Sequence, residues 1–297
     1  AAYAQAVADA CAEPHLVTLE PGEANKCPDT WLSVLRIMLK AGFDRGDALV
    51  AVGGGVIGDL GGFVAATYMR GIDFYNLPTT LLAMVDSSVG GKVAVDLDGY
   101  KNIIGTFYQP RAVLADPCVL QTLDARQYAC GMAEIIKMFA TSDAAMFARL
   151  EDRSACISRE ELICAALRIK MAVVEADERE GGLRRVLNFG HTVGHAVESI
   201  SARQPYPLLH GECVSIGMLA MTDGEVRHRL TRLLHRYDLP TAFRCGRDDL
   251  CAVLAHDKKA GADGITTVRV PEIGRFTLQK ESTDDILGSC GEVISFL

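Results

Sequence analysis

Two histidines in residues 188–195 have residue types and a spacing suited to chemistry. His191 and His195 are four residues apart, which places both imidazoles on one face of a helix. This spacing suits zinc, which imidazole nitrogen binds readily. Thr192 follows His191 where a metalloprotease motif carries glutamate, so the pattern does not indicate that class. A separate structural role for each histidine remains the alternative.

Other candidate metal ligands occur on neighbouring predicted helices. Glu134 and Lys137 are one helical turn apart, and the motif His210-Gly-Glu212 opens another helix. Imidazole and carboxylate groups together are typical ligands of a divalent metal. The histidines and Glu134 therefore favour a metal site, with solvated or core side chains as the alternative.

A glycine-rich loop at residues 53–58 follows a predicted strand and opens a helix. It satisfies G-x-G-x-x-G, in which glycines let a pyrophosphate approach the backbone and the helix N-terminus attracts it. We expect Asp59 in the first helical turn. Asp73 begins a strand, so the acidic residue of a standard dinucleotide fingerprint is missing, and a structural tight turn is the alternative.

Basic residues recur in an acidic chain. The net charge is −8, which argues against nucleic-acid binding. The segment Ser87-Ser-Val-Gly-Gly-Lys92 is a flexible turn that can hold an anion, or a surface loop with a solvated lysine. Together, the basic side chains predict a site for an acidic, phosphorylated substrate; they are Arg70, Lys92, Lys101, Lys170, Arg184, Lys258 and Lys259.

Hydrophobic periodicity predicts the elements that position these groups. Short strands are expected at residues 15–19, 48–52, 74–77, 93–97 and 112–115, with a type I′ turn at Asp98-Gly99. Helices are expected at residues 28–41, 124–140, 159–176, 188–201 and 211–228. The pattern predicts an α/β domain with a mostly parallel sheet at residues 1–117 and a mainly helical domain at residues 118–297.

Composition excludes some classes of protein. The 297 residues are 49% hydrophobic and contain no run of eighteen apolar residues, so no membrane span is expected. The ten cysteines form no Cys-x-x-Cys motif, and most lie in apolar stretches that predict buried positions. Free thiols and the lack of a signal peptide favour the cytoplasm.

The order of several motifs resembles the 3-dehydroquinate synthase family. The resemblance covers residues 22–259, and the combination of motifs is specific although single members are not. The motifs are Gly53-Gly-Gly-Val-Ile-Gly-Asp59, Pro78-Thr-Thr-Leu-Leu82, Asp86-Ser-Ser-Val-Gly-Gly-Lys92, Gly131-Met-Ala-Glu-Ile-Ile-Lys137, Asp177-Glu-Arg-Glu-Gly-Gly-Leu-Arg184, Asn188-Phe-Gly-His-Thr-Val-Gly-His195, His210-Gly-Glu212 and Asp257-Lys-Lys259.

The resemblance implies a Rossmann-like NAD domain, a helical metal domain and a role for each motif residue. The metal, zinc with cobalt as the alternative, would be held by Glu134, His191 and His210. NAD would contact Glu23, Lys26, Gly54, Gly55, Asp59, Thr79, Thr80 and Lys101. Catalytic roles fall to Asp86, Lys137, Lys170, Asn188 and His195, and further substrate contacts to Arg70, Lys92, Asn102, Arg184 and Lys258, with Lys259 as the alternative to Lys258.

The implied reaction is the cyclisation of 3-deoxy-D-arabino-heptulosonate 7-phosphate to 3-dehydroquinate and phosphate, by a homodimer. Related inosose or valiolone synthases and metal-dependent polyol dehydrogenases are alternatives, as is a non-catalytic module of a larger assembly. Arg184, Asn188 and Lys258 suit a substrate carboxylate, which favours the dehydroquinate synthase. The family normally begins with a further strand and helix, so we expect a truncated chain or one domain of a multifunctional polypeptide.

Overall fold

The computed structural model describes residues 2–256 and 264–297. The chain divides into two compact units, Ala1–Leu123 and Asp124–Leu297. The first unit extends beyond residue 117 because the 3₁₀ turn Pro117–Thr122 is tied to helix α1 (Ala2–Ala8). The Tyr3 hydroxyl lies 2.9 Å from Thr122 Oγ1 and 3.4 Å from the Val119 carbonyl oxygen.

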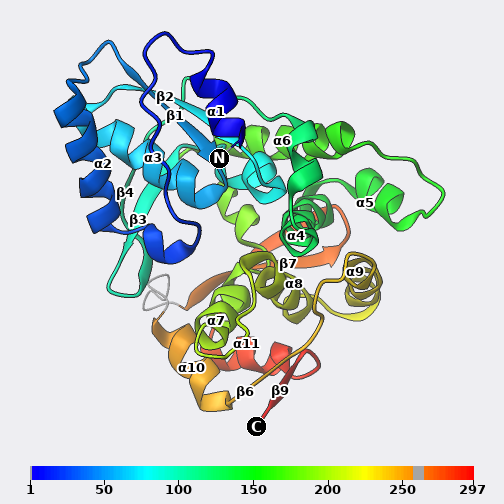
Figure 1. Cartoon of the computed structure of the whole chain (residues 1–297). Helices are drawn as coiled ribbons and strands as arrows, with labels where there is room; N and C mark the ends of the chain where they lie inside the picture. Colours follow the sequence, from blue (N-terminus) through cyan, green and yellow to red (C-terminus); the bar gives the residue numbers. More distant parts are fainter. Residues whose placement is uncertain (1, 257–263) are drawn as a thin grey trace. The chain divides into compact units, whose positions relative to one another are not determined.

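The first unit contains a parallel sheet in the order β1-β2-β5, formed by β1 (Ala48–Gly53), β2 (Asp73–Pro78) and β5 (Ala112–Val113). Helix α3 (Gly55–Thr67) connects β1 to β2 and packs against both (Figure 1). Val64, Ala65 and Phe74 belong to the core between helix and sheet. Two parallel strands joined by a helix form the Rossmann-like unit that the sequence predicts.

Helix α2 (Pro28–Ala41) begins and ends where the sequence predicts. Pro28 occupies the first turn, where its missing N–H costs no hydrogen bond. Gly42 ends the helix in the left-handed conformation, with φ of 79°.

The predicted hairpin is confirmed. It pairs β3 (Lys92–Leu97) with β4 (Tyr100–Phe107), and the turn residues Asp98 and Gly99 have φ of 50° and 81°. The predicted strand at residues 15–19 is wrong. That segment pairs with no strand among the described residues, and Leu16 is 47% exposed, so only part of its apolar pattern reaches the core.

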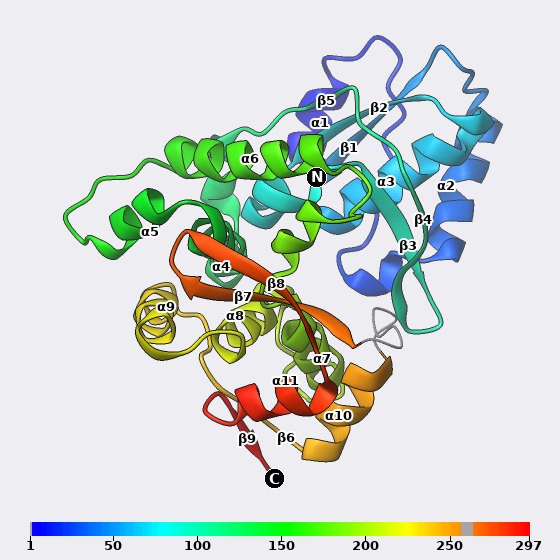
Figure 2. The same ribbon diagram turned by 180° about the vertical axis from the view of Figure 1, so that it is seen from behind.

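The second unit is mainly helical. Its helices are α4 (Ala125–Ser142), α5 (Ala144–Glu151), α6 (Arg159–Ala176), α7 (His191–Ser201), α8 (His210–Ala220), α9 (Gly224–Arg236), α10 (Arg247–His256) and α11 (Thr283–Cys290). The bounds of α6 are the predicted ones, and the Ser158 side chain caps its first turn. The antiparallel hairpin of β7 (Ile265–Glu272) and β8 (Arg275–Glu281), missed by the prediction, is seen in Figure 2. Parallel strands β6 (Phe243–Cys245) and β9 (Ile294–Phe296) complete the unit.

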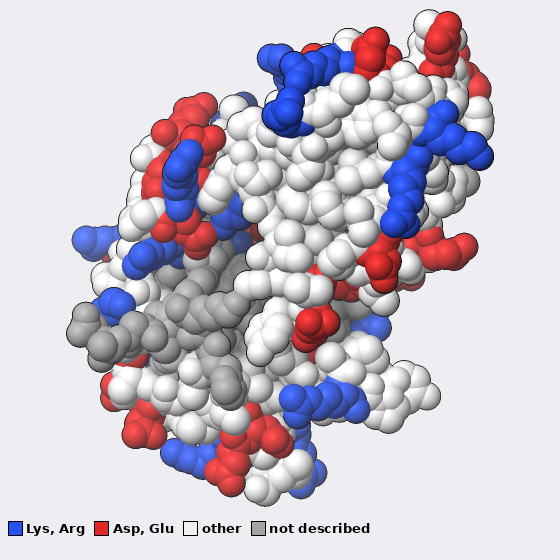
Figure 3. Space-filling view, turned by 90° about the vertical axis from the view of Figure 1, so that its left-hand side faces the viewer, with Lys and Arg blue, Asp and Glu red and all other residues white. Residues whose placement is uncertain are grey.

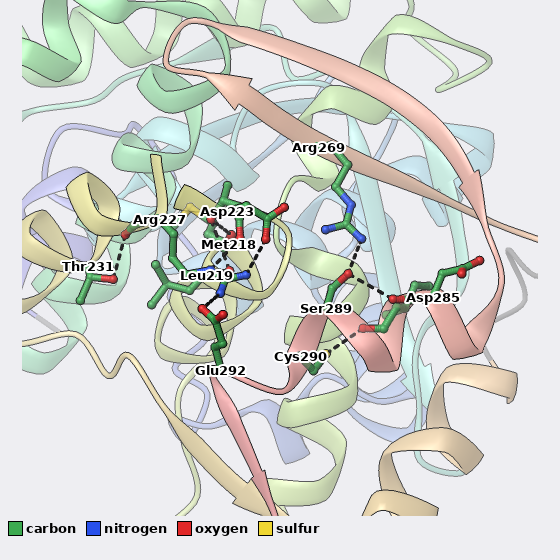
Figure 4. Close-up of polar contacts among 12 residues, drawn as sticks. Met218, Leu219, Asp223, Arg227, Thr231, Arg269, Asp285, Ser289, Cys290 and Glu292 are labelled. Carbon is green, nitrogen blue, oxygen red and sulfur yellow. Dashed lines mark hydrogen bonds and ion pairs between the residues drawn. The ribbon is translucent and has the colours of Figure 1, made fainter. Parts of the chain in front are cut away.

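The single helix predicted at residues 211–228 is wrong, because the chain breaks between α8 and α9. The Arg227 side chain lies over this break (Figure 4). Its Nε donates to the carbonyl oxygens of Leu219 (3.0 Å) and Thr222 (2.6 Å), and its guanidinium pairs with Asp223 and Glu292. Arg227 thus satisfies carbonyl groups that the end of α8 leaves open.

All ten cysteines are free thiols, but the expectation that most are buried is wrong. Cys11, Cys118, Cys156 and Cys164 are exposed, because they lie in loops or on the outer faces of helices. No helix in the described part of the chain is long and apolar enough to cross a membrane.

Candidate functional site

Helices α7 and α8 approach each other closely through glycine. A Cβ atom on Gly217 would lie 1.9 Å from the Gly190 carbonyl oxygen, and one on Gly194 would lie 3.1 Å from the Cys213 carbonyl oxygen. Gly190 also has φ of 78°, which favours glycine. Only residues without a side chain allow this crossing.

Helix α7 starts at His191 rather than at residue 188. Leu183–Asn188 forms a 3₁₀ turn, and the left-handed Gly190 turns the chain into the helix. His191 and His195 share a face of α7, as their spacing predicts, and α8 begins at His210. The ring centroid of His191 lies 5.1 Å from that of His195 and 5.2 Å from that of His210.

Helix α4 places Glu134 against the imidazoles. The Glu134 side chain is fully buried, and its Oε1 lies 3.5 Å from His210 Nε2 and 3.8 Å from His191 Nε2. Its Oε2 forms an ion pair with Lys137, which is 1% exposed. Neither carboxylate oxygen has a hydrogen bond of acceptable geometry among the described residues. A buried carboxylate facing two imidazole nitrogens suits a cation between them.

The Nδ1 atoms of His191 and His210, which point away from Glu134, also have polar contacts. His191 Nδ1 lies 3.2 Å from the Phe189 carbonyl oxygen, and His210 Nδ1 lies 3.3 Å from Glu198 Oε2. If Nδ1 of each ring donates its proton outward, the lone pair of each Nε2 faces Glu134. Metal-binding histidines typically show this arrangement.

The titratable groups differ in charge. Burial alone would raise the pKa of Glu134, but Lys137 and His210 lower it to about 2. Burial, reinforced by Lys137, lowers the pKa of His191 well below its ordinary value. Burial would also lower the pKa of His210, but Glu134 and Glu198 raise it to about 10. A cation bound at Nε2 of His210 would replace a proton, because metal ligands bind deprotonated.

The donor set fits a tetrahedral divalent metal. Two zinc ligands about 2.1 Å from the ion lie about 3.4 Å apart, close to the distances from Glu134 Oε1 to the two Nε2 atoms. A second set is also compact, because nitrogens of His191, His195 and His210 lie within 4.8 Å of one another. Glu134 favours the first set. A bound cation would stabilise its buried carboxylate more than it would stabilise the less buried imidazole of His195.

A loop before α7 orders several predicted substrate residues. Asp177 accepts hydrogen bonds from the backbone N–H groups of Gly181 (2.8 Å), Gly182 (2.7 Å) and Arg184 (2.9 Å). The Asn188 side chain donates to Glu180. Buried charges also include Arg184 and Lys170, which are 2% and 6% exposed.

In the first unit, three predicted contact residues converge on Lys26, itself a predicted contact. Its Nζ lies 2.7 Å from Asp59 Oδ2 and 3.6 Å from Glu23 Oε1, and it donates to Asn102 Oδ1. Burial raises the pKa of Asp59 to about 6, against the pull of Lys26. Burial alone would lower the pKa of Lys26, but Asp59 and Glu23 raise it. The structure therefore brings predicted NAD residues together with Asn102, a predicted substrate residue.

The glycine-rich loop connects β1 to α3, as predicted. A Cβ atom on Gly54 would lie 3.1 Å from Thr80 Cγ2, and one on Gly55 would lie 3.1 Å from Ser87 Oγ. The Thr79 N–H donates to the Gly53 carbonyl oxygen at 2.8 Å. The loop therefore packs against the segment after β2, and its backbone suits a phosphate group. Asp59 lies beyond the first turn of α3, which contains no acidic residue, so that detail of the prediction is wrong.

The remaining predicted contact residues of the first unit lie on several different elements. Asp86 lies in a π-helical turn, Ala83–Ser87, while Lys92 begins β3 and Lys101 lies on β4, both exposed. Arg70 is exposed and has φ of 70°. Lys258 and Lys259 lie outside the described residues.

Sequence reasoning missed Glu198, and it singled out Glu212 as a metal candidate without its supporting role. Glu198 follows His191 by two helical turns on α7, so the helical spacing contained a signal. Glu212 accepts from the Leu209 N–H (2.7 Å) and pairs with Arg126 of α4 through two contacts of 2.6 and 2.7 Å. No local pattern indicates that long-range pair.

Two family models match consecutive parts of the chain. The model described as 3-dehydroquinate synthase N-terminal matches residues 16–130, and the one described as 3-dehydroquinate synthase C-terminal matches residues 131–260. A 3-dehydroquinate synthase of Latilactobacillus sakei is 44% identical over 273 residues, which are 89% of this chain and 76% of that protein.

Solved structures of sugar-phosphate cyclases share the fold. ValA, a 2-epi-5-epi-valiolone synthase from Streptomyces hygroscopicus with NAD+ and Zn2+ bound, has a TM-score of 0.83 and 28% identity, over 93% of this chain and 81% of that one. A 2-deoxy-scyllo-inosose synthase complexed with carbaglucose-6-phosphate, NAD+ and Co2+ has a TM-score of 0.82 and 28% identity, over 94% and 82%. With family models matching most of its length and a relative at 44% identity, the chain belongs to the 3-dehydroquinate synthase family.

Proposed function

We propose that the chain converts 3-deoxy-D-arabino-heptulosonate 7-phosphate to 3-dehydroquinate and phosphate, using NAD and a divalent metal. The observation that carries this proposal is the buried Glu134 carboxylate, which faces Nε2 of both His191 and His210. Family membership supplies the reaction, and this donor set supplies a place for its metal.

Zinc is the proposed metal, held by Glu134, His191 and His210, with cobalt as the alternative. The solved valiolone synthase contains Zn2+ and the inosose synthase contains Co2+. When bound, the metal polarises substrate hydroxyl groups and lowers the cost of removing their protons. His195 lies beside the ligands, where its imidazole can hold or pass on a substrate proton.

NAD is the proposed organic cofactor, and it serves by accepting a hydride and returning it. The backbone of Gly54 and Gly55, at the start of α3, suits its pyrophosphate. The other proposed contacts are Glu23, Lys26, Asp59, Thr79, Thr80 and Lys101. Lys26 is the best supported of them, because its side chain is 4% exposed and its ammonium lies between the carboxylates of Glu23 and Asp59.

A substrate with a carboxylate and a phosphate needs basic side chains that are shielded from solvent, so that they bind its two anionic groups. Lys137, Lys170 and Arg184 provide buried positive charge in the second unit. Asn188, held by Glu180, can donate to a substrate oxygen after a rotation of its amide. The proposal also includes substrate contacts from Arg70, Asp86, Lys92, Asn102 and Lys258.

We include a homodimer and a cytoplasmic location in the proposal. The side on which α2 and the β3–β4 hairpin lie has a broad area without charged side chains (Figure 3). On the β3–β4 hairpin, the apolar residues Leu97, Ile103 and Ile104 are between 36% and 42% exposed. Exposed apolar strands are typical of interfaces between chains. The ten free thiols suit a reducing compartment.

The test is to incubate the purified protein with the heptulosonate phosphate, NAD and Zn2+, and to measure phosphate and 3-dehydroquinate. We expect equal amounts of both products and no net NADH, since the hydride returns to the substrate. The control variant His191→Ala should release no phosphate above background. Accumulation of NADH with glycerol would instead indicate a polyol dehydrogenase.

A second reaction mixture separates the proposal from a related cyclase of the inosose type. A hexose 6-phosphate lacks the carboxylate for which the basic residues are proposed. We expect no phosphate release from it, whereas turnover of the hexose phosphate would favour a cyclase of the inosose type.

A further inference from the structure

Glu198 is a nearly buried carboxylate that the predicted site does not include. It lies on the face of α7 that carries His191 and His195, and its side chain is 14% exposed. Its Oε2 is 3.3 Å from Nδ1 of His210, which belongs to α8. The carboxylate therefore joins the two helices that carry the candidate histidine ligands.

The two candidate histidine ligands are held in different ways. The His191 ring is 10% exposed, and its Nδ1 faces the Phe189 carbonyl oxygen, a backbone group whose position the preceding turn sets. The His210 ring is 32% exposed and lies at the first residue of its helix. His210 thus has more freedom to rotate, and its outer contact is a side chain.

The backbone at His210 is already fixed by other contacts. Glu212 accepts from the Leu209 N–H, and Arg126 pairs with Glu212 while donating to the Pro207 carbonyl oxygen at 2.9 Å. These contacts hold the start of α8 but do not touch the imidazole. The orientation of the ring about its side-chain bonds therefore depends on the groups beside Nδ1 and Nε2.

We infer that Glu198 is a positioning residue that prepares His210 to bind the divalent metal. When a cation replaces the Nε2 proton, Glu198 would keep the other proton on Nδ1, so that the Nε2 lone pair stays directed towards Glu134 Oε1, 3.5 Å away. Its negative charge also increases the electron density that the ring offers a cation. The inference rests on the proposed metal site.

The test measures zinc affinity by competition with a chelator, independently of turnover. Loss of an outer carboxylate typically weakens metal binding by about 10–100-fold. We expect a loss in this range for Glu198→Leu and a smaller one for Glu198→Gln, whose amide oxygen can still accept the Nδ1 proton. The matched control is Glu175→Gln, on the exposed face of α6, which should leave zinc affinity unchanged.

The absorption bands of bound Co2+ give a second measurement, since they report the geometry of the ligands. Glu198→Leu should shift these bands, and circular dichroism should show an unchanged helix content. Zinc affinity within twofold of wild type, with unchanged bands, would overturn the inference. Failure of the wild-type protein to bind one zinc per chain would instead overturn the proposed metal site.

Discussion

Gly217 packs directly against Gly190, since a Cβ atom at Gly217 would lie 1.9 Å from the Gly190 carbonyl oxygen. This contact brings α7, which carries His191, against α8, which carries His210. We expect Gly217→Ala to push the helices apart, to lower the free energy of unfolding by at least about 2 kcal/mol and to weaken zinc binding. Chemical denaturation and chelator competition measure the two effects.

Gly288→Ala is the matched control, because a Cβ atom there meets nothing within 4 Å and Gly288 also lies in a helix. It should leave zinc affinity near its wild-type value and raise the free energy of unfolding by at most about 1 kcal/mol, because alanine favours the helix more than glycine does. Zinc affinity that survives Gly217→Ala unchanged would show that the helix crossing does not set the ligand geometry.

The two candidate ligand sets differ in Glu134 and His195. We expect Glu134→Gln and His191→Ala to lose bound zinc while the helix content persists, because each removes one donor of the proposed set. His195→Ala should retain one zinc per chain and lower only the rate of phosphate release. Metal analysis after dialysis measures this, and loss of zinc in His195→Ala alone would favour the three-histidine set.

Much of this fold was predictable where local chemistry dominates. Gly42 ends α2, Asp98-Gly99 turns the β3–β4 hairpin, and Ser158 caps α6, and all three act within a few residues. The predicted helix at residues 211–228 failed because its break depends on Arg227, which bonds carbonyl groups that precede it and Glu292 far along the chain.

In the candidate site, too, local features were predictable from the sequence and long-range contacts were not. The spacing of His191 and His195 predicted one helix face, which α7 confirms. Spacing does not indicate that Glu134, fifty-odd residues earlier, faces His191 Nε2; that assignment came from the resemblance. Glu198 was visible as a member of the α7 face, but its partner His210 lies on another helix, so sequence periodicity carried no sign of their contact.

Asp59 should make stability depend on pH. Its pKa in the folded chain is about 6, above the ordinary value of 3.8, because burial disfavours the carboxylate. The folded form therefore holds the proton more tightly than the unfolded form. The stabilisation is fully present below about pH 4 and is lost as pH rises through 6, by at most about 3 kcal/mol.

We expect Asp59→Asn to remove this part of the pH dependence, as measured by chemical denaturation from pH 4.5 to 7.5. Asp284→Asn, at an exposed position of α11, serves as the control and should keep the wild-type slope. An unchanged slope in Asp59→Asn would show that the ion pair with Lys26 offsets the effect of burial on the pKa of Asp59. NAD binding by the variant should weaken, because Asp59 is a proposed contact.

Arg227 should contribute strongly to stability without contributing to metal binding. The residue is 9% exposed, and its guanidinium donates to carbonyl oxygens at the end of α8 as well as to Asp223 and Glu292 (Figure 4). Arg227→Met removes the donors and leaves buried carbonyl groups without partners, at a cost of about 3 kcal/mol in the free energy of unfolding.

Arg232→Met, on the same helix, removes a side chain that is 68% exposed and 3.7 Å from Glu225, so it should cost less than about 0.5 kcal/mol. Thermal and chemical unfolding compare the two variants, and equal stabilities would mean that the break between α8 and α9 is held by other contacts. Zinc affinity should match wild type in both, because neither arginine touches Glu134, His191 or His210 in the described contacts.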